Sequence, residues 1–233
     1  MSHILDRPVW SALTTRHAAL AEGGDLARRY DPSIVPFAAA RDDSGEESLR
    51  ALGALAGPGE NLLLLQADEI ALPRGFAPIT TARGVQMILK RPPPKVSDTR
   101  IERLRDADAA DMLALATLTK PGPFTLRAQA LGEFWGVKEN GAIVAMAGER
   151  MKQEGVTEIS GVCTHPDFTG RGLARLLSVF VAHRVLERGE TPYLHAYATN
   201  TAAIGLYESI GFELRSMMNV AVVKAEDAAT APA

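Results

Sequence analysis

The feature that most limits the fold of this chain is a strand, a glycine-containing turn and a long helix in succession over residues 156–187. Residues 156–164 read as a strand, and Pro166 disfavours helix at the residue before it, which ends that strand. The helix has one apolar face at the spacing i, i+3, i+4, i+7 and i+8, formed by Leu173, Leu176, Leu177, Phe180 and Val181. Other strands and helices alternate along the chain, so we predict an α/β (mixed α+β) fold with a mixed sheet covered by helices.

The turn between this strand and helix predicts a phosphate-binding site. Gly170 and Gly172 tolerate unusual dihedral angles and let another group approach the backbone closely. The unpaired N–H groups at the start of a helix carry about half a positive charge, which suits a diphosphate. Arg171 and Arg175 add charge at its edge, and small Ala174 leaves room. An ordinary glycine-containing loop is the alternative, and Arg175 replaces the third glycine of the dinucleotide fingerprint.

Two segments resemble the GNAT superfamily of N-acyltransferases. Residues 162–174 are similar to its acetyl-CoA-binding motif, a strand followed by a Q/R-x-x-G-x-G/A turn and a helix. Thr169 stands where Gln or Arg is usual, which removes one side-chain contact and leaves the backbone cradle intact. Residues 200–212 resemble the N-x-x-A-x-x-x-Y-x-x-x-G-F helix that closes the cofactor site. The two motifs occur in the family's order, and the resemblance covers about residues 99–224.

The resemblance implies a central, mostly antiparallel mixed sheet flanked by helices and direct transfer of the acetyl group of acetyl-CoA to a primary amine. The acceptor would be a small molecule or a peptide. A catalytically silent CoA-binding module and an enzyme for a longer acyl-CoA are the alternatives. The implied cofactor-binding residues are Val162, Cys163, Thr164, Thr169, Gly170, Arg171, Gly172, Leu173, Ala174, Arg175, Asn200, Ala203 and Tyr207. A backbone N–H near Val162 would polarise the thioester carbonyl.

Two residues are candidates for proton transfer. Glu158 precedes Val162 by four on the same predicted strand face, so it is the candidate base, acting through water. A solvated glutamate at a strand end is the alternative, and Glu133 and Glu149 are weaker candidate bases. Tyr207 is the candidate general acid for the leaving CoA thiolate, with a packing tyrosine as the alternative.

We expect different roles for two further residues near the site. Period-two alternation places Cys163 on one face with Ile159 and Gly161, and we expect a small buried thiol rather than a covalent nucleophile. Phe124 follows a proline- and glycine-rich connector where the family meets its acceptor. We therefore predict Phe124 as a wall of the substrate pocket, with a loop-pinning aromatic as the alternative.

The prolines at 92–94 divide the predicted chain into two parts. We predict an accessory α+β domain over residues 1–91, a linker over 92–98, a GNAT domain over 99–224 and a disordered polar tail over 225–233. Within the first part, residues 22–45 are expected to be mostly loop. This domain is either a purely structural accessory domain or one wall of the substrate pocket.

Composition excludes several classes of function. A net charge of -3 gives no reason to expect nucleic-acid binding or attraction to an anionic membrane. The five histidines and one cysteine show no metal-binding spacing, so no metal is expected. There is no disulfide framework, no signal-peptide pattern at the start and no apolar stretch of about 20 residues, which favours a cytoplasmic protein without a membrane span. A homodimer through the extra domain is the candidate assembly.

Overall fold

The computed structural model describes residues 3–42, 45–57 and 59–226. Its main sheet has eight strands in the order β4-β11-β5-β10-β9-β8-β7-β6. The strands are β4 (Asn61–Gln66), β5 (Phe76–Leu89), β6 (Ile101–Leu104), β7 (Phe134–Glu139), β8 (Ala142–Gln153), β9 (Val156–Thr164), β10 (Thr191–Tyr197) and β11 (Phe212–Ala225). Strands β9 and β10 are parallel, and every other neighbouring pair in this sheet is antiparallel. The predicted mixed, mostly antiparallel sheet is confirmed.

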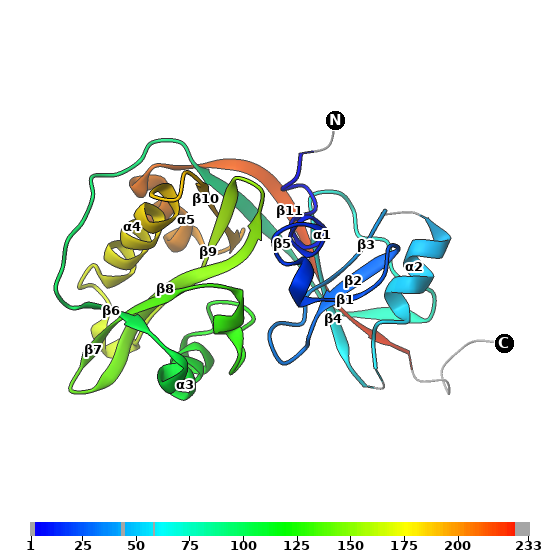
Figure 1. The fold of residues 1–233 in the computed structure, drawn as a ribbon, viewed down its shortest axis with the longest axis horizontal. Helices are drawn as coiled ribbons and strands as arrows, with labels where there is room; N and C mark the ends of the chain where they lie inside the picture. The colour runs from blue at the N-terminus through cyan, green and yellow to red at the C-terminus, as the bar shows by residue number, and fades with distance from the viewer. Residues whose placement is uncertain (1–2, 43–44, 58, 227–233) are drawn as a thin grey trace.

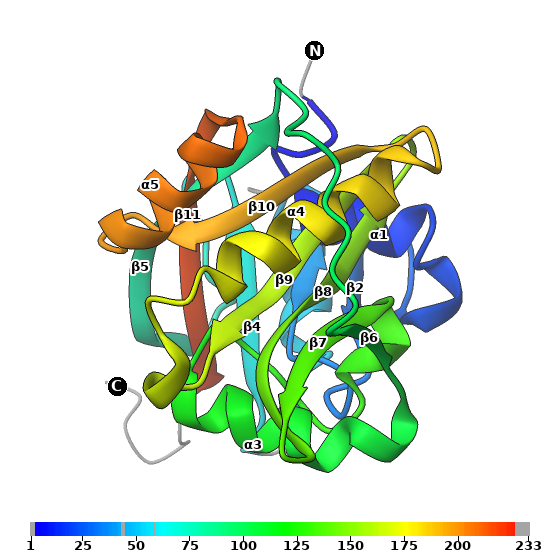
Figure 2. The ribbon, with the colours of Figure 1, turned by 90° about the vertical axis from the view of Figure 1, so that its left-hand side faces the viewer.

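Helices cover both faces of this sheet (Figure 2). On one face, α4 (Leu173–Leu186) and α5 (Thr201–Ile210) pack in an apolar cluster with Ile159 and Leu194. On the other face, α3 (Ala109–Thr119) packs against Met146 and Cys163. The apolar positions that predicted the helix at 172–187 all pack in the apolar cluster on the first face, and Val179, Ala182 and Val185 of α4 are buried as well.

The N-terminal residues form a small sheet and two helices, which occupy the middle and one end of the molecule (Figure 1). The helices are α1 (Pro8–Thr14) and α2 (Glu46–Gly53), and the antiparallel strands are β1 (Ala21–Gly23), β2 (Ala27–Tyr30) and β3 (Ala38–Ala40). Most described residues of 22–45 lie outside strands, as expected for a loop, but these three short strands were not predicted. Strands of three or four residues are too short to show a period of two, and β3 consists of alanines alone. Short 3₁₀ helices occur at Ala18–Leu20, Asp106–Asp108, Ala128–Leu131 and Pro166–Phe168.

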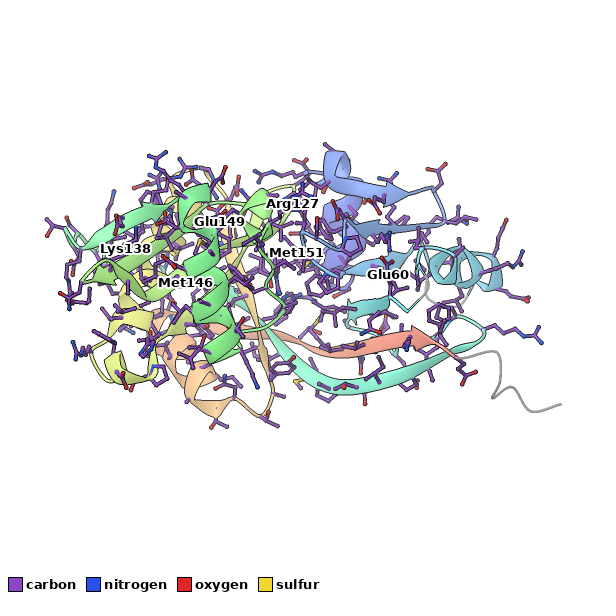
Figure 3. All side chains as sticks on the ribbon, turned by 90° about the horizontal axis from the view of Figure 1, so that it is seen from below. Glu60, Arg127, Lys138, Met146, Glu149 and Met151 are labelled. Carbon is purple, nitrogen blue, oxygen red and sulfur yellow. The ribbon has the colours of Figure 1, made fainter. Side chains whose placement is uncertain are left out.

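The long strands β5 and β11 connect the two ends of the molecule (Figure 1). Strand β5 precedes the prolines in sequence yet lies between β10 and β11 in the sheet. Met151 of β8, labelled in Figure 3, is completely buried in one apolar cluster with Val9 and Leu13 of α1. Residues 92–98 form an irregular connector, and strands from before and after it share one sheet and one apolar cluster.

A tight turn at Asn140 and Gly141, with φ of 51° and 83°, joins β7 to β8. The predicted polar tail begins too early, because Ala225 is the last residue of β11; residues 227–233 lie outside the described part of the chain. Within the described residues, no helix is long and apolar enough to cross a membrane.

Candidate active site

Strands β9 and β10 separate halfway along β9. Their parallel pairing runs from Thr191 opposite Val156 to Leu194 opposite Ile159 and then ends. Residues 160–164 continue to pair with β8 on the other side. The edge of β9 that faces β10 is therefore available for an added extended chain. The buried hydroxyl of Thr164 lies at the end of this edge and has no hydrogen-bond partner in the described structure.

A β-bulge lies at the start of the separated segment. Ser160 is opposite Gly148 and Cys163 is opposite Met146, so three steps on β9 match two on β8. Gly161 adopts φ of 63°, and a Cβ there would lie 2.9 Å from Cε1 of Phe134. The bulge therefore depends on a glycine at this position.

This bulge overturns two predictions made from period-two alternation. Ile159 and Val162 both pack on the α4 side, whereas Cys163 packs on the α3 side. Cys163 therefore does not share a face with Ile159, and Glu158 does not share a face with Val162. The expectation of a buried thiol is confirmed: Cys163 is 7% exposed, and burial raises the pKa of its thiol to about 11.

The turn before α4 has the backbone that its glycines predicted. Gly170 and Gly172 have φ of 76° and 74°. No side chain caps the helix, and in the described structure the N–H groups of residues 173–175 have no acceptor. A Cβ at either glycine would meet no atom within 4 Å, so the space beside the turn is open. These features fit a bound phosphate group.

The side chains around this turn are held by local contacts. Thr169 donates its hydroxyl hydrogen to the carbonyl oxygen of Pro166 (2.9 Å). The Arg171 guanidinium lies 4.6 Å from the centre of the Phe168 ring. Arg175 Nη1 donates to Ser209 Oγ (2.7 Å), which ties the start of α4 to α5. Leu173, the first residue of α4, is buried, and Ala174 is half-buried.

Helix α5 brings Tyr207 to the same face of the sheet as α4. The N–H of Ala203 donates to Asn200 Oδ1 (3.1 Å), so Asn200 is the N-cap of α5. Tyr207 is 7% exposed, and burial raises its pKa to about 12. Its ring is edge-on to Phe212 with the centroids 6.1 Å apart, and its hydroxyl has no partner among the described residues.

Glu158 is completely buried in a polar cluster. Arg150 donates from Nε to Oε2 (2.8 Å) and from Nη2 to Oε1 (2.5 Å), and His195 Nδ1 lies 2.7 Å from Oε1. Burial alone would raise the pKa of Glu158, but the charge and hydrogen bonds of Arg150, together with His195, lower it to about 2. A solvated strand-end glutamate is therefore excluded. Glu133 and Glu149 also lie in ion pairs.

A pocket that opens to solvent adjoins this cluster. Its apolar walls include Phe37, Leu63, Leu65 and Val220, and its polar side chains include Arg150 and His195. Residues 121–123 of the connector after α3 close one side. Phe124 does not line this pocket, because its ring packs edge-on against Phe134 with the centroids 5.5 Å apart.

Arg150 and His195 were not among the site residues predicted from the sequence. Arg150 and the neighbouring Glu149 follow the apolar run 143–147 of β8, and charged residues continuing a buried strand were the available signal. His195 could not be found this way, because a lone histidine near a strand end has no distinctive pattern. Within the described ranges, no three His, Cys, Asp or Glu side chains are placed to share a metal ion.

A protein-family model described as FR47-like protein matches residues 135–221. The chain is similar to a crystal structure of a GNAT-family protein from Novosphingobium aromaticivorans DSM 12444, with 39% sequence identity, a TM-score of 0.91, and coverage of 97% of this chain and 100% of the other. A GCN5-related N-acetyltransferase from Kribbella flavida shares the fold at 15% identity and a TM-score of 0.63, with 94% and 93% coverage. No curated protein matches the sequence. The fold, the two motifs and the similarity over nearly the whole length agree: the chain belongs to the GNAT family.

Proposed function

We propose that this protein is an N-acetyltransferase that moves the acetyl group of acetyl-CoA directly to a primary amine. The observation that carries the proposal is the separation of β9 from β10 beyond Ile159, beside a strand that leads into the uncapped start of α4. An extended arm can pair with the free strand edge while a diphosphate contacts the helix start.

Specific groups of this chain would hold the donor. The N–H groups of residues 173–175 and the open backbone at Gly170 and Gly172 suit the diphosphate. The unpartnered Thr164 hydroxyl and the edge of β9 suit the amide-containing arm. Acetyl-CoA supplies an activated thioester, and a backbone N–H near Val162 would stabilise the charge that develops on its carbonyl oxygen.

Tyr207 is proposed to act on the leaving sulfur. A phenol with a pKa of about 12 is a weaker acid than a thiol, whose ordinary pKa is about 8.5. Complete proton transfer to a free thiolate would therefore be uphill. Tyr207 accordingly donates a hydrogen bond that strengthens as negative charge develops on the sulfur.

We assign Glu158 to positioning the Arg150 side chain and not to taking a proton from the amine. Its carboxylate does not line the pocket, and both oxygens accept hydrogen bonds. A lysine-like amine costs about 4.6 kcal/mol to deprotonate at neutral pH, whereas an α-amine with a pKa near 7.8 costs about 1 kcal/mol. A site without a free base near the acceptor thus favours the less basic amine.

The donor site is tested by Gly172→Ala with Gly189→Ala as its matched control. Gly189 follows α4, has φ of 75° like the 74° of Gly172, and would also meet no atom within 4 Å of an added Cβ. Both substitutions carry the same backbone strain, but only the first places a methyl group in the proposed diphosphate space. We expect an equal loss of melting temperature in both and at least a tenfold weaker acetyl-CoA affinity in Gly172→Ala alone.

Equal acetyl-CoA affinities in the two variants would contradict this assignment. Turnover is measured separately as thiol release from acetyl-CoA with amino acids, polyamines, aminoglycosides and peptides. Tight CoA binding without release on any amine would favour the silent CoA-binding module, and faster release from a longer acyl-CoA would favour that donor.

A further inference from the structure

The pocket beside Arg150 opens where the strands of the main sheet separate. His195, Ala196 and Tyr197 of β10 line it, and they follow the last residue of β10 that pairs with β9, Leu194. Under the proposed function, the reacting carbonyl carbon lies at this separation. The pocket is therefore placed to hold the acceptor.

The polar side chains behind this pocket form hydrogen bonds with one another. Gln86 is completely buried, and its Nε2 donates to the carbonyl oxygen of Leu5 (2.9 Å) and lies 2.8 Å from His195 Nε2. Gln86 Oε1 accepts from Arg215 Nε, so the amide orientation follows from its partners. His195 Nε2 must then be an acceptor and its Nδ1–H must donate to Glu158. Both ring nitrogens of His195 are thus engaged within the cluster.

Arg150 is the exception in this cluster. Its side chain is 10% exposed, and its Nε and Nη2 are bound to Glu158. Its Nη1 has no hydrogen-bond partner within the described structure and lies 4.0 Å from the position that a Cβ on Gly122 would take. Gly122 and Arg150 both line the pocket, so Nη1 presents its N–H groups there.

The other walls of the pocket offer apolar contacts. Phe37, Leu63, Leu65 and Val220 line it, and the Phe37 ring stacks on the Arg150 guanidinium with 4.9 Å between the ring centre and Cζ. A guanidinium donor that opens onto the pocket without a partner among the described residues favours a ligand that brings an oxygen to it. Glu158 already balances the charge of Arg150, so the oxygen can belong to a carboxylate or to a carbonyl.

We propose that the acceptor is an apolar α-amino acid or its amide. In such an amine, the carbon that bears the amino group also bears a carboxylate or carboxamide group and an apolar side chain. Arg150 Nη1 donates to an oxygen of that group, and Phe37, Leu63 and Leu65 contact the side chain. This inference rests on the proposed function for the identity of the reacting group. A plain alkylamine would leave Nη1 without a partner.

Matched acceptors test this directly. Leucine and phenylalanine, their amides, and the decarboxylated amines isoamylamine and phenethylamine keep the same side chain and differ in the carboxylate or carboxamide group. Because this group also changes the basicity of the amine, binding is compared as well as turnover. Binding is measured by calorimetry in the presence of CoA, and turnover by thiol release from acetyl-CoA. In at least one series we expect the amino acid or the amide to bind and to react at least tenfold better than the decarboxylated amine.

A double variant, Arg150→Met with Glu158→Gln, removes the donor without leaving a buried unpaired charge. It should lower the preference for the oxygen-bearing acceptor to about one and leave CoA affinity unchanged. Arg127→Met, at an exposed ion pair with Asp31, is the control and should keep the preference. If the double variant does not fold, the comparison of acceptors on the natural protein decides alone.

The outcomes separate this inference from the proposed function. Equal turnover of decarboxylated amines and amino acids overturns the inference and leaves acetyl transfer intact. Binding of an amino acid that depends on Arg150, without turnover of any amine, supports the inference and overturns acetyl transfer. Failure of every amino acid and amide to bind at millimolar concentration overturns the inference.

Discussion

The ion pair between Glu158 and Arg150 predicts a large and pH-dependent contribution to stability. Glu158 is fully buried, and its pKa is lowered from 4.5 to about 2. A difference of that size corresponds to about 3 kcal/mol of folding free energy at neutral pH. Glu158→Gln removes this term and leaves the buried charge of Arg150 unbalanced, so we expect a loss of about 3–5 kcal/mol at pH 7.

The pH dependence gives the sharper test. Because the folded pKa is below the unfolded one, this stabilisation is complete above about pH 4.5 and is lost as the pH falls towards 2. At pH 3 only about 1 kcal/mol of the carboxylate contribution remains. The stability difference between the natural protein and Glu158→Gln should therefore narrow between pH 5 and pH 3.

Urea unfolding followed by circular dichroism at pH 7, 5, 4 and 3 measures this difference. Glu102→Gln is the control, because Glu102 is half exposed and lies 3.6 Å from Lys138. A surface pair of this kind contributes about 0.5 kcal/mol, so the control should unfold almost as the natural protein does. A difference below about 1 kcal/mol at pH 7 for Glu158→Gln, or one that stays constant with pH, would refute the reasoning.

Three further predictions concern the site. Gly161→Ala should destabilise the protein by about 1–3 kcal/mol in thermal unfolding, because of its positive φ and the close Phe134 ring, whereas Gly205→Ala within α5 should be neutral or stabilising. Cys163 should react with iodoacetamide only on unfolding, because its pKa of about 11 leaves little thiolate; rapid native alkylation would contradict its burial. Tyr207→Phe should lower kcat at least tenfold with little change in acetyl-CoA affinity, and unchanged turnover would remove its proposed role.

Predictions from the sequence succeeded where the signal was local. Periodicity located α4, and the motif at residues 200–212 located α5, whose cap Asn200 bonds a backbone N–H three residues away. Gly170 and Gly172 adopt the positive φ that glycine permits at low cost. These features depend on a few neighbouring residues, so the amino-acid order is sufficient to predict them.

Predictions failed where a single residue changed the register. The bulge at Gly161 inserts one extra step, and every face assignment across it is reversed. As a result, Cys163 and Glu158 were assigned to the wrong faces relative to Ile159 and Val162. A glycine within a predicted strand was the signal for this bulge, but only the pairing with β8 identifies where the extra step falls.

The amino-acid sequence by itself determined the strand, turn and helix that face the donor and the capped helix carrying Tyr207, because both are short-range patterns of backbone conformation and apolar spacing. Only the tertiary structure decided that β5 lies between β10 and β11, that Arg150 and His195 meet Glu158, and that Phe37 completes the pocket. These contacts join residues far apart in the chain. They depend on strand order, bulges and burial, which no local pattern specifies.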